Sequence, residues 1–213
     1  MDFLPSKIAT YAENHSTAES DLLRNLNRET HLNVLSPRML SGHLQGRVLS
    51  MISYMIAPEL IVEIGTYTGY SALCLAEGLK ENGRLITIDF NAELKNMHNQ
   101  FLNEFPQRKK IEVIYDDAKK VIPTLPDEID IVFIDADKEN YSLYFDLIFN
   151  KVKPGGFILA DNVLWSGKVV EEVKESDKST LALLDFNKKI MNDDRVENVL
   201  LPIRDGIMII RKK

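Results

Sequence analysis

Apolar residues recur at helical spacing over the first 55 positions, and the pattern then changes to short apolar runs. The periodic positions of the first clear helix are Leu22, Leu23 and Leu26. Ser16–Glu19 has the spacing of a capping box and predicts the start of this helix. Ser36-Pro37 predicts another helix start, because proline at the first helical position loses no hydrogen bond that the helix needs. We therefore expect a helical segment over residues 1–55.

Short apolar runs then alternate with stretches of helical spacing. The five runs span residues 60–64, 85–89, 111–115, 129–134 and 156–160, the last of them preceded by a predicted turn at 154–156. Their β-branched composition and their length are typical of buried strands. Strands of this kind, connected by helices, predict a parallel sheet that is covered on both faces.

The last two predicted strands break this regularity. Residues 198–203 and 206–211 are separated only by Arg204 and Asp205, which is too short for a crossover between parallel strands. At least one strand must therefore run antiparallel. We predict an α/β fold in one domain over residues 1–213: a doubly wound, mostly parallel seven-stranded sheet with one antiparallel C-terminal strand and extra N-terminal helices.

Composition and charge narrow the class of protein. Lys and Arg number 26 against 32 Asp and Glu, a net charge of −6, so the strong positive field typical of nucleic-acid binding is missing. The single cysteine, Cys74, excludes an intrachain disulfide and a multi-thiolate metal site. Residues 1–5 lack a signal-peptide pattern, and no apolar stretch approaches the roughly 20 residues of a membrane span. We expect a soluble, cytoplasmic protein.

A loop with two glycines follows the first predicted strand. Gly65 and Gly69 let the backbone turn sharply and approach a ligand before the next helix begins. Tyr67 stands where the dinucleotide-binding fingerprint requires its second glycine, and a tyrosine side chain would obstruct a pyrophosphate. The loop therefore favours a nucleoside ligand without a diphosphate over NAD.

Asp89 ends the second predicted strand and follows Gly69 by 20 residues. A carboxylate at this place can accept both hydroxyl groups of a ribose. The alternative is that Asp89 caps the helix that follows it. Together with the glycine loop, this acid favours S-adenosylmethionine as the ligand.

Oxygen-bearing side chains end the fourth and fifth predicted strands. Asp135 follows the fourth strand, and Asp161 and Asn162 follow the fifth. We expect these strands to be neighbours, so that the three side chains converge. Such donors suit a hard divalent cation, with Mg²⁺ first and Ca²⁺ or Mn²⁺ as alternatives, and leave positions open for two adjacent hydroxyls of an aromatic ring. The alternative is that these residues only form turns after the strands.

Lys138 lies three residues beyond Asp135, within reach of a hydroxyl bound to the predicted cation. A neighbouring cation favours the neutral form of a lysine, and the neutral amine can act as a general base. The alternative is a lysine that simply lies in solvent.

Three segments in order resemble one particular family. They are Glu-Ile-Gly-Thr-Tyr-Thr-Gly-Tyr-Ser at 63–71, Phe-Ile-Asp-Ala-Asp-Lys-Glu-Asn-Tyr at 133–141 and Ala-Asp-Asn-Val-Leu-Trp at 160–165. They resemble the cation-dependent, S-adenosylmethionine-dependent O-methyltransferases of the caffeoyl-CoA and catechol type, as a bacterial-type member. The resemblance implies a Rossmann-like methyltransferase fold, a homodimer, and methyl transfer from S-adenosylmethionine to a hydroxyl of a small vicinal-diol aromatic.

The resemblance also implies roles for individual residues. The positions that match the family's cofactor contacts are Met39, Ser41, Glu63, Gly65, Thr66, Ser71, Asp89, Asp117, Ala118, Asp135 and Asp137. The positions that match its metal ligands are Asp135, Asp161 and Asn162. Lys138 matches its proposed base, and Trp165 and Ser166 match its acceptor contacts. Asp116 departs from the family's pattern, because a glycine usually stands at that position.

Two other functions stay open. The same fold could methylate a hydroxylated nucleoside in tRNA, such as 5-hydroxyuridine, if the lysines at 109, 110, 119 and 120 form a local basic patch. The chain could also be a non-catalytic cofactor-binding module, against which the predicted metal site argues. Trp165 could serve in packing alone. The histidines, including His98, have no ligand spacing, and we assign them no role.

Overall fold

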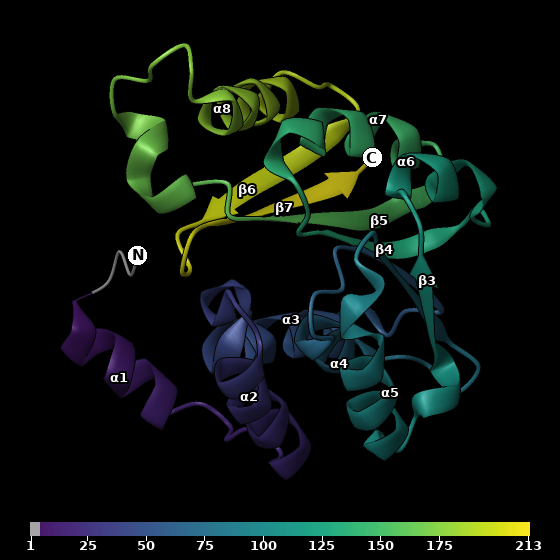
Figure 1. The fold of residues 1–213 in the computed structure, drawn as a ribbon. Coiled ribbons are helices and arrows are strands. Elements are labelled where there is room, and N and C mark those ends of the chain that lie inside the picture. Colours follow the sequence, from purple (N-terminus) through teal and green to yellow (C-terminus); the bar gives the residue numbers. More distant parts are fainter. Residues whose placement is uncertain (1–4) are drawn as a thin grey trace. The chain divides into compact units, whose positions relative to one another are not determined.

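The computed structural model describes residues 5–213 (Figure 1). Two compact units make up the chain, one ending at Asp117 and the other running from Ala118 to Lys213. The part of the predicted helical segment that falls on residues 1–4 lies outside the described residues. In the range 5–213, no helix combines the length and the hydropathy that a membrane crossing requires.

The unit that ends at Asp117 pairs three strands with five α-helices. The helices are α1 (Ser6–Asn14), α2 (Asp21–Asn33), α3 (Gly42–Ile56), α4 (Tyr70–Ala76) and α5 (Lys95–Glu104). The strands are β1 (Leu60–Ile64), β2 (Arg84–Asp89) and β3 (Ile111–Tyr115). Strand β2 pairs in parallel with β1 and with β3. Every residue of β1 is buried, as its continuous apolar pattern predicts.

Two details of the N-terminal helices differ from the sequence prediction. Ser20, rather than Ser16, caps α2, since its side chain accepts a hydrogen bond from the backbone N–H of Leu23. The Ser16 hydroxyl instead donates to the carbonyl of Ala12, 2.7 Å away. The predicted capping box was therefore wrong, because Ser16 is already used at the end of the preceding helix. The start predicted at Ser36-Pro37 yields only one 3-10 turn, Pro37–Met39.

The unit from Ala118 to Lys213 holds four strands and three α-helices. The strands are β4 (Ile129–Ile134), β5 (Val152–Asp161), β6 (Val196–Leu201) and β7 (Ile207–Lys212). The helices are α6 (Ala118–Val121), α7 (Tyr141–Phe149) and α8 (Lys178–Met191). Strands β4 and β5 are parallel, whereas β7 runs antiparallel to both β5 and β6. The strand order of the sheet is β3-β2-β1-β4-β5-β7-β6, which confirms the predicted fold class.

Strand β5 begins earlier than predicted. The predicted turn at 154–156 lies inside the strand, where the pairing register with β4 shifts between Ile129 and Ile131. Gly155 has a φ of +77°, a conformation that glycine adopts at little cost. Between these two pairs β4 advances two residues while β5 advances from Val152 to Phe157, and this irregularity lets the chain remain a strand through a sequence that otherwise indicates a turn.

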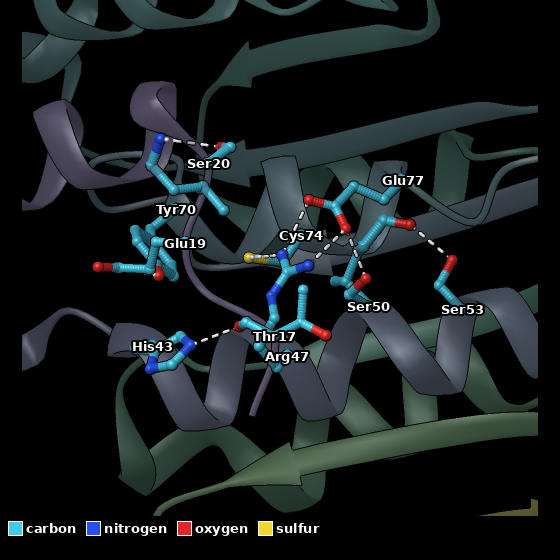
Figure 2. A network of polar contacts seen from close by, with 12 residues as sticks. Thr17, Glu19, Ser20, His43, Arg47, Ser50, Ser53, Tyr70, Cys74 and Glu77 are labelled. Carbon is cyan, nitrogen blue, oxygen red and sulfur yellow. Dashed lines mark hydrogen bonds and ion pairs between the residues drawn. The ribbon is translucent and has the colours of Figure 1, made fainter. Parts of the chain in front are cut away.

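A polar network joins α3 to α4 in the first unit (Figure 2). Arg47 and Glu77 form a mostly buried ion pair, with 2.8 Å between Nη2 and Oε1. The Ser50 hydroxyl donates to the same carboxylate at 2.6 Å. Beside this network, the Tyr70 hydroxyl donates to Glu19, ahead of α2, at 2.5 Å. These bonds attach the N-terminal segment to the helix that follows the glycine loop.

Candidate active site

The glycine loop between β1 and α4 has the left-handed backbone that its sequence predicts. Gly65 and Gly69 have φ values of +101° and +91°, and Tyr67 between them has +49°. The Gly65 N–H donates to the carbonyl of Ile88 at 2.8 Å, which ties the start of the loop to β2. A tyrosine in this conformation is strained, and such residues persist where their surroundings hold them.

Asp89, at the end of β2, holds the glycine loop in place. One of its oxygens accepts hydrogen bonds from the backbone N–H groups of Thr66 and Tyr67, at 3.0 and 2.7 Å. The other accepts from the N–H of Asn91 at 2.8 Å. The side chain of Asn91, not that of Asp89, caps the helical turn that follows. The capping alternative for Asp89 was therefore wrong, and its carboxylate has about four lone-pair sites in all, enough to accept a further hydroxyl.

Glu63 lies below the loop, fully buried in β1. The Thr87 hydroxyl donates to its Oε2 at 2.5 Å. The Thr87 hydroxyl has only one proton, and it donates that proton to Glu63. The Thr66 hydroxyl, 2.5 Å away, must therefore be the donor to Thr87. A chain of hydroxyls thus links the loop to a buried carboxylate. The predicted role of Glu63 and Thr66 in cofactor binding stays a prediction.

The segment with Met39 and Ser41 is attached to the glycine loop through Tyr67. The Tyr67 hydroxyl donates to the carbonyl of Ser36 at 2.8 Å. Met39 is exposed, while Ser41 is buried directly before α3. Ser71, a further predicted cofactor contact, is buried in the first turn of α4.

The predicted adenine contacts Asp117 and Ala118 fall where one compact unit ends and the next begins. Asp116, which replaces the family's glycine, accepts a hydrogen bond from the N–H of Asp117 at 2.7 Å. This bond uses the side chain that a glycine would not have, and it shapes the turn between β3 and α6.

His98, in the unit that ends at Asp117, is a residue that the sequence prediction missed. It lies on α5, is 1% exposed, and its ring nitrogens contact the Tyr67 carbonyl and the Tyr115 hydroxyl. Burial lowers the pKa of the imidazole below its usual value. The only signal in the sequence was helical spacing, because His98 shares the buried face of α5 with Phe101 and Leu102.

In the second unit, Asp135 and Asp161 follow neighbouring strands. Ile134 pairs with Ala160 in the parallel register of β4 and β5, so the two carboxylates extend from adjacent strand ends. Asp161 is 2% exposed, and its Oδ1 accepts from the N–H of Asn162 at 2.8 Å. Within residues 5–213, no group of three or more His, Cys, Asp and Glu side chains forms a metal cluster. The predicted ligand set has two carboxylates and one amide, and it stays a prediction.

Lys138 is buried between Asp135 and Tyr141. Its Nζ donates to Asp135 Oδ1 at 3.1 Å and to the Tyr141 hydroxyl at 2.5 Å. The Nζ also lies 5.8 Å from the centre of the Trp165 ring. The solvated-lysine alternative was therefore wrong, while the predicted acceptor contact of Trp165 stays a prediction.

Tyr141 is a second residue that the sequence prediction missed. Its buried hydroxyl lies 3.2 Å from the carbonyl of Ile134 and 3.0 Å from that of Asp161, so it bridges the ends of β4 and β5. Burial raises the pKa of Tyr141 well above its usual value, and the charges of Asp135 and Asp161 add to this effect. The hydroxyl therefore keeps its proton and serves as a fixed acceptor for Lys138.

Asp137 forms contacts of its own at the start of α7. Its carboxylate accepts from the Tyr144 hydroxyl at 2.5 Å and from the Asn140 amide. These bonds stabilise the turn between β4 and α7. The predicted contact of Asp137 with the cofactor stays a prediction.

The acceptor loop, residues 162–167, has an unusual backbone. Asn162, Trp165 and Ser166 all have positive φ values. The Ser166 N–H donates to the Asp205 carboxylate, and the Leu164 N–H donates to the Asp205 carbonyl at 2.9 Å. The turn before β7 thus holds a strained loop beside Lys138, an arrangement that is common at functional sites.

Comparisons with known proteins identify the family of this chain. Residues 13–213 match the family model described as O-methyltransferase. A probable caffeoyl-CoA O-methyltransferase 2 from Dictyostelium discoideum is 31% identical over 97% of this chain and 92% of its own length. Caffeoyl-CoA O-methyltransferase 5 from Nicotiana tabacum is 32% identical over 79% of this chain and 75% of its own.

Solved structures share the fold. A methyltransferase from Podospora anserina, solved with bound SAH, has a TM-score of 0.89 at 26% identity, over 100% of this chain and 99% of that one. An O-methyltransferase from Bacillus cereus in complex with SAH also has a TM-score of 0.89, at 24% identity over 97% of each chain. The chain therefore belongs to the S-adenosylmethionine-dependent O-methyltransferase family.

Proposed function

We propose that this chain is a divalent-cation-dependent O-methyltransferase that acts on a small aromatic vicinal diol of the catechol or caffeoyl type. The observation that carries the proposal is the pairing of β4 with β5, which sets Asp135 and Asp161 on adjacent strand ends next to buried Lys138. The caffeoyl-CoA names of the relatives support the acceptor class.

The donor set fits a hard cation. Asp135, Asp161 and Asn162 offer carboxylate and amide oxygens, the ligands that Mg²⁺, Ca²⁺ and Mn²⁺ prefer, and we propose Mg²⁺ first. When bound, S-adenosylmethionine supplies an electrophilic methyl group, and the cation supplies Lewis acidity that lowers the pKa of a hydroxyl.

Lys138 is the proposed base. In the structure its Nζ donates to Asp135 and forms an ion pair with it. A cation held by Asp135 would place a second positive charge beside this amine, and such a charge favours the neutral, proton-accepting form of a lysine. Tyr141 keeps the Nζ in position to take the proton of the acceptor hydroxyl.

Residues near Lys138 form the surface that we propose for contact with the methyl acceptor. Trp165 places an aromatic ring 5.8 Å from the Lys138 Nζ, suitable for packing against a flat substrate. Ser166 is exposed on the same anchored loop and can offer its hydroxyl.

The test is an assay with labelled S-adenosylmethionine, Mg²⁺ and a panel of catechols, caffeoyl esters and 5-hydroxyuridine-containing tRNA. We expect methylation of the small diols, its loss with EDTA, and a loss of at least about 100-fold in Asp161→Ala. The matched control is Asp146→Ala on the exposed side of α7, which should keep full activity. Activity that survives both EDTA and Asp161→Ala would contradict cation dependence, and methylation of the tRNA alone would favour the tRNA alternative.

We also propose a homodimer that uses the N-terminal helices. Large apolar side chains are exposed there, namely Ile8, Tyr11, Leu32, Leu35, Met51, Tyr54 and Met55. Exposed large apolar side chains gathered in one part of a chain favour a protein–protein contact there. Light scattering should give twice the chain mass, and Leu35→Glu with Met55→Glu should reduce it to the monomer. Because Cys74 is free, we further propose a reducing cytoplasmic location.

A further inference from the structure

His98 connects two strand ends of the first unit through its ring. Its Nε2 lies 2.6 Å from the Tyr67 carbonyl in the loop after β1. Its Nδ1 lies 2.7 Å from the Tyr115 hydroxyl at the end of β3. The ring is 1% exposed, so water cannot replace either partner without opening the structure.

The two partners determine the tautomer. A carbonyl oxygen can only accept, so Nε2 must carry the proton that points to Tyr67. The neutral ring then has a lone pair at Nδ1, which accepts the Tyr115 O–H. Burial favours this neutral form, in which both hydrogen bonds are satisfied.

Tyr67 is the residue whose conformation this bond supports. Its backbone N–H donates to Asp89, its hydroxyl donates to the Ser36 carbonyl, and its own carbonyl accepts from His98. With a φ of +49°, Tyr67 needs such partners, because a non-glycine residue in this region is strained. His98 supplies the one bond that reaches the loop from α5.

We propose that His98 is a positioning residue for the cofactor: its ring holds the glycine loop in its binding shape through the hydrogen bond to the Tyr67 carbonyl. The proposal rests on the cofactor half of the proposed function and on neither the cation nor the acceptor. His98 itself need not touch the ligand, since it acts through Tyr67.

Several charged and titratable groups surround the ring. Asp89 faces it from β2 and Tyr115 from β3, while the Lys95 Nζ on α5 lies 5.8 Å from the Tyr115 ring centre and Arg108 acts on Tyr115. Burial lowers the pKa of His98 below its ordinary 6.5, against opposing effects of the Tyr67 carbonyl and Asp89. The folded chain therefore binds fewer protons than the unfolded chain just below pH 6.5. This contribution to stability is fully present above that pH and is lost as the pH falls through the lowered pKa.

The experiment measures S-adenosylhomocysteine binding by calorimetry at pH 7.5, without acceptor or divalent cation. His98→Leu removes both hydrogen bonds, His98→Gln keeps a side-chain donor toward Tyr67, and His43→Gln is the control on a histidine that bonds the Thr17 carbonyl instead. We expect His43→Gln to bind as tightly as the unaltered protein.

The two substitutions at position 98 should differ in their effect on affinity for S-adenosylhomocysteine. His98→Leu should bind about tenfold more weakly than the unaltered protein, and His98→Gln should stay within about threefold of it. Unchanged affinity in His98→Leu, or a loss in His98→Gln as large as that in His98→Leu, would overturn the proposal. Absence of binding by the unaltered protein would instead overturn the cofactor assignment, and this proposal with it.

Discussion

Cys74 shows, at the residue scale, how the surroundings of a side chain determine its reactivity. The thiol is fully buried in α4, and the Arg47 Nη2 lies 3.8 Å from its Sγ. Burial outweighs the attraction of the guanidinium and raises the pKa of Cys74 to about 12. Since the thiolate is the reactive form, the residue is inert despite its basic neighbour.

We predict that Cys74 does not react with iodoacetamide at pH 8 while the chain is folded. Mass spectrometry should find full modification only after denaturant is added. The same reagent on the unfolded chain serves as the control for its reactivity. Modification of the native protein at the rate of a free thiol would show that the surroundings of Cys74 open far more often than its burial indicates.

Tyr141→Phe tests the hydroxyl that bridges β4 and β5. Its removal leaves the Lys138 ammonium without one buried acceptor, so the free energy of unfolding should fall by about 1–3 kcal/mol. Tyr54→Phe, at a mostly exposed site on α3, should change it by less than about 0.5 kcal/mol. Urea denaturation of both variants makes the comparison. Equal free energies of unfolding for the two variants would mean that the Tyr141 hydroxyl contributes little to stability.

Asp135, Asp161 and Lys138 were predictable because strand ends are visible in the pattern, and parallel neighbours align their carboxyl ends. Tyr141 and His98 were not. The Tyr141 hydroxyl reaches a carbonyl 20 residues away, and His98 reaches one 31 residues away. Such contacts depend on how a helix packs on the sheet, which residue spacing along the chain does not specify.

At the scale of elements, glycine sets the distance between α3 and the turn after α4. A Cβ added at Gly78 would lie 2.3 Å from the backbone carbon of Ser53 and 2.4 Å from the backbone nitrogen of Tyr54. Backbone atoms cannot rotate away as side chains do, so the helix itself would have to move.

We predict that Gly78→Ala lowers the free energy of unfolding by at least about 3 kcal/mol. Gly155→Ala provides the comparison in β5, where a new Cβ meets no atom within 4 Å and only the positive φ is unfavourable. That variant should lose about 1 kcal/mol. Thermal and urea unfolding followed by circular dichroism would measure both. A smaller loss in Gly78→Ala than in Gly155→Ala would contradict the close approach of the helix backbone.

The existence and order of the strands were predicted well, whereas the first residues of some elements were missed. The apolar runs of β1, β3 and β4 begin and end where their patterns indicate. In β1 and β4 every residue is buried, because both faces of a parallel sheet demand apolar residues. The start of β5 was missed, since an irregularity in its pairing with β4 accommodates Pro154 and two glycines that usually indicate a turn. The start of α2 was missed because Ser16 and Ser20 both suit a cap, and only packing decides between them.

For the whole molecule, the cofactor should be a measurable source of stability. A ligand that binds only the folded chain, present at 100 times its Kd, adds about 2.7 kcal/mol to the free energy of unfolding. For a chain of this length each kcal/mol raises Tm by about 2–4 °C, so S-adenosylhomocysteine should raise Tm by about 5–10 °C. Adenosine at the same concentration should raise Tm less. Scanning calorimetry tests this, and an unchanged Tm with saturating S-adenosylhomocysteine would contradict the expectation.

The acceptor loop, residues 162–167, has a consequence for protein engineering. Its backbone is held from one side by Asp205 and Gly206, through bonds to Leu164 and Val163. The stretch that follows, 171–176, is largely exposed and contains neither helix nor strand. Segments of other lengths and sequences can therefore be grafted between residues 171 and 176 without disturbing Lys138. Because we propose that Trp165 and Ser166 contact the acceptor, a library confined to this stretch is a direct way to vary the surface next to that proposed contact.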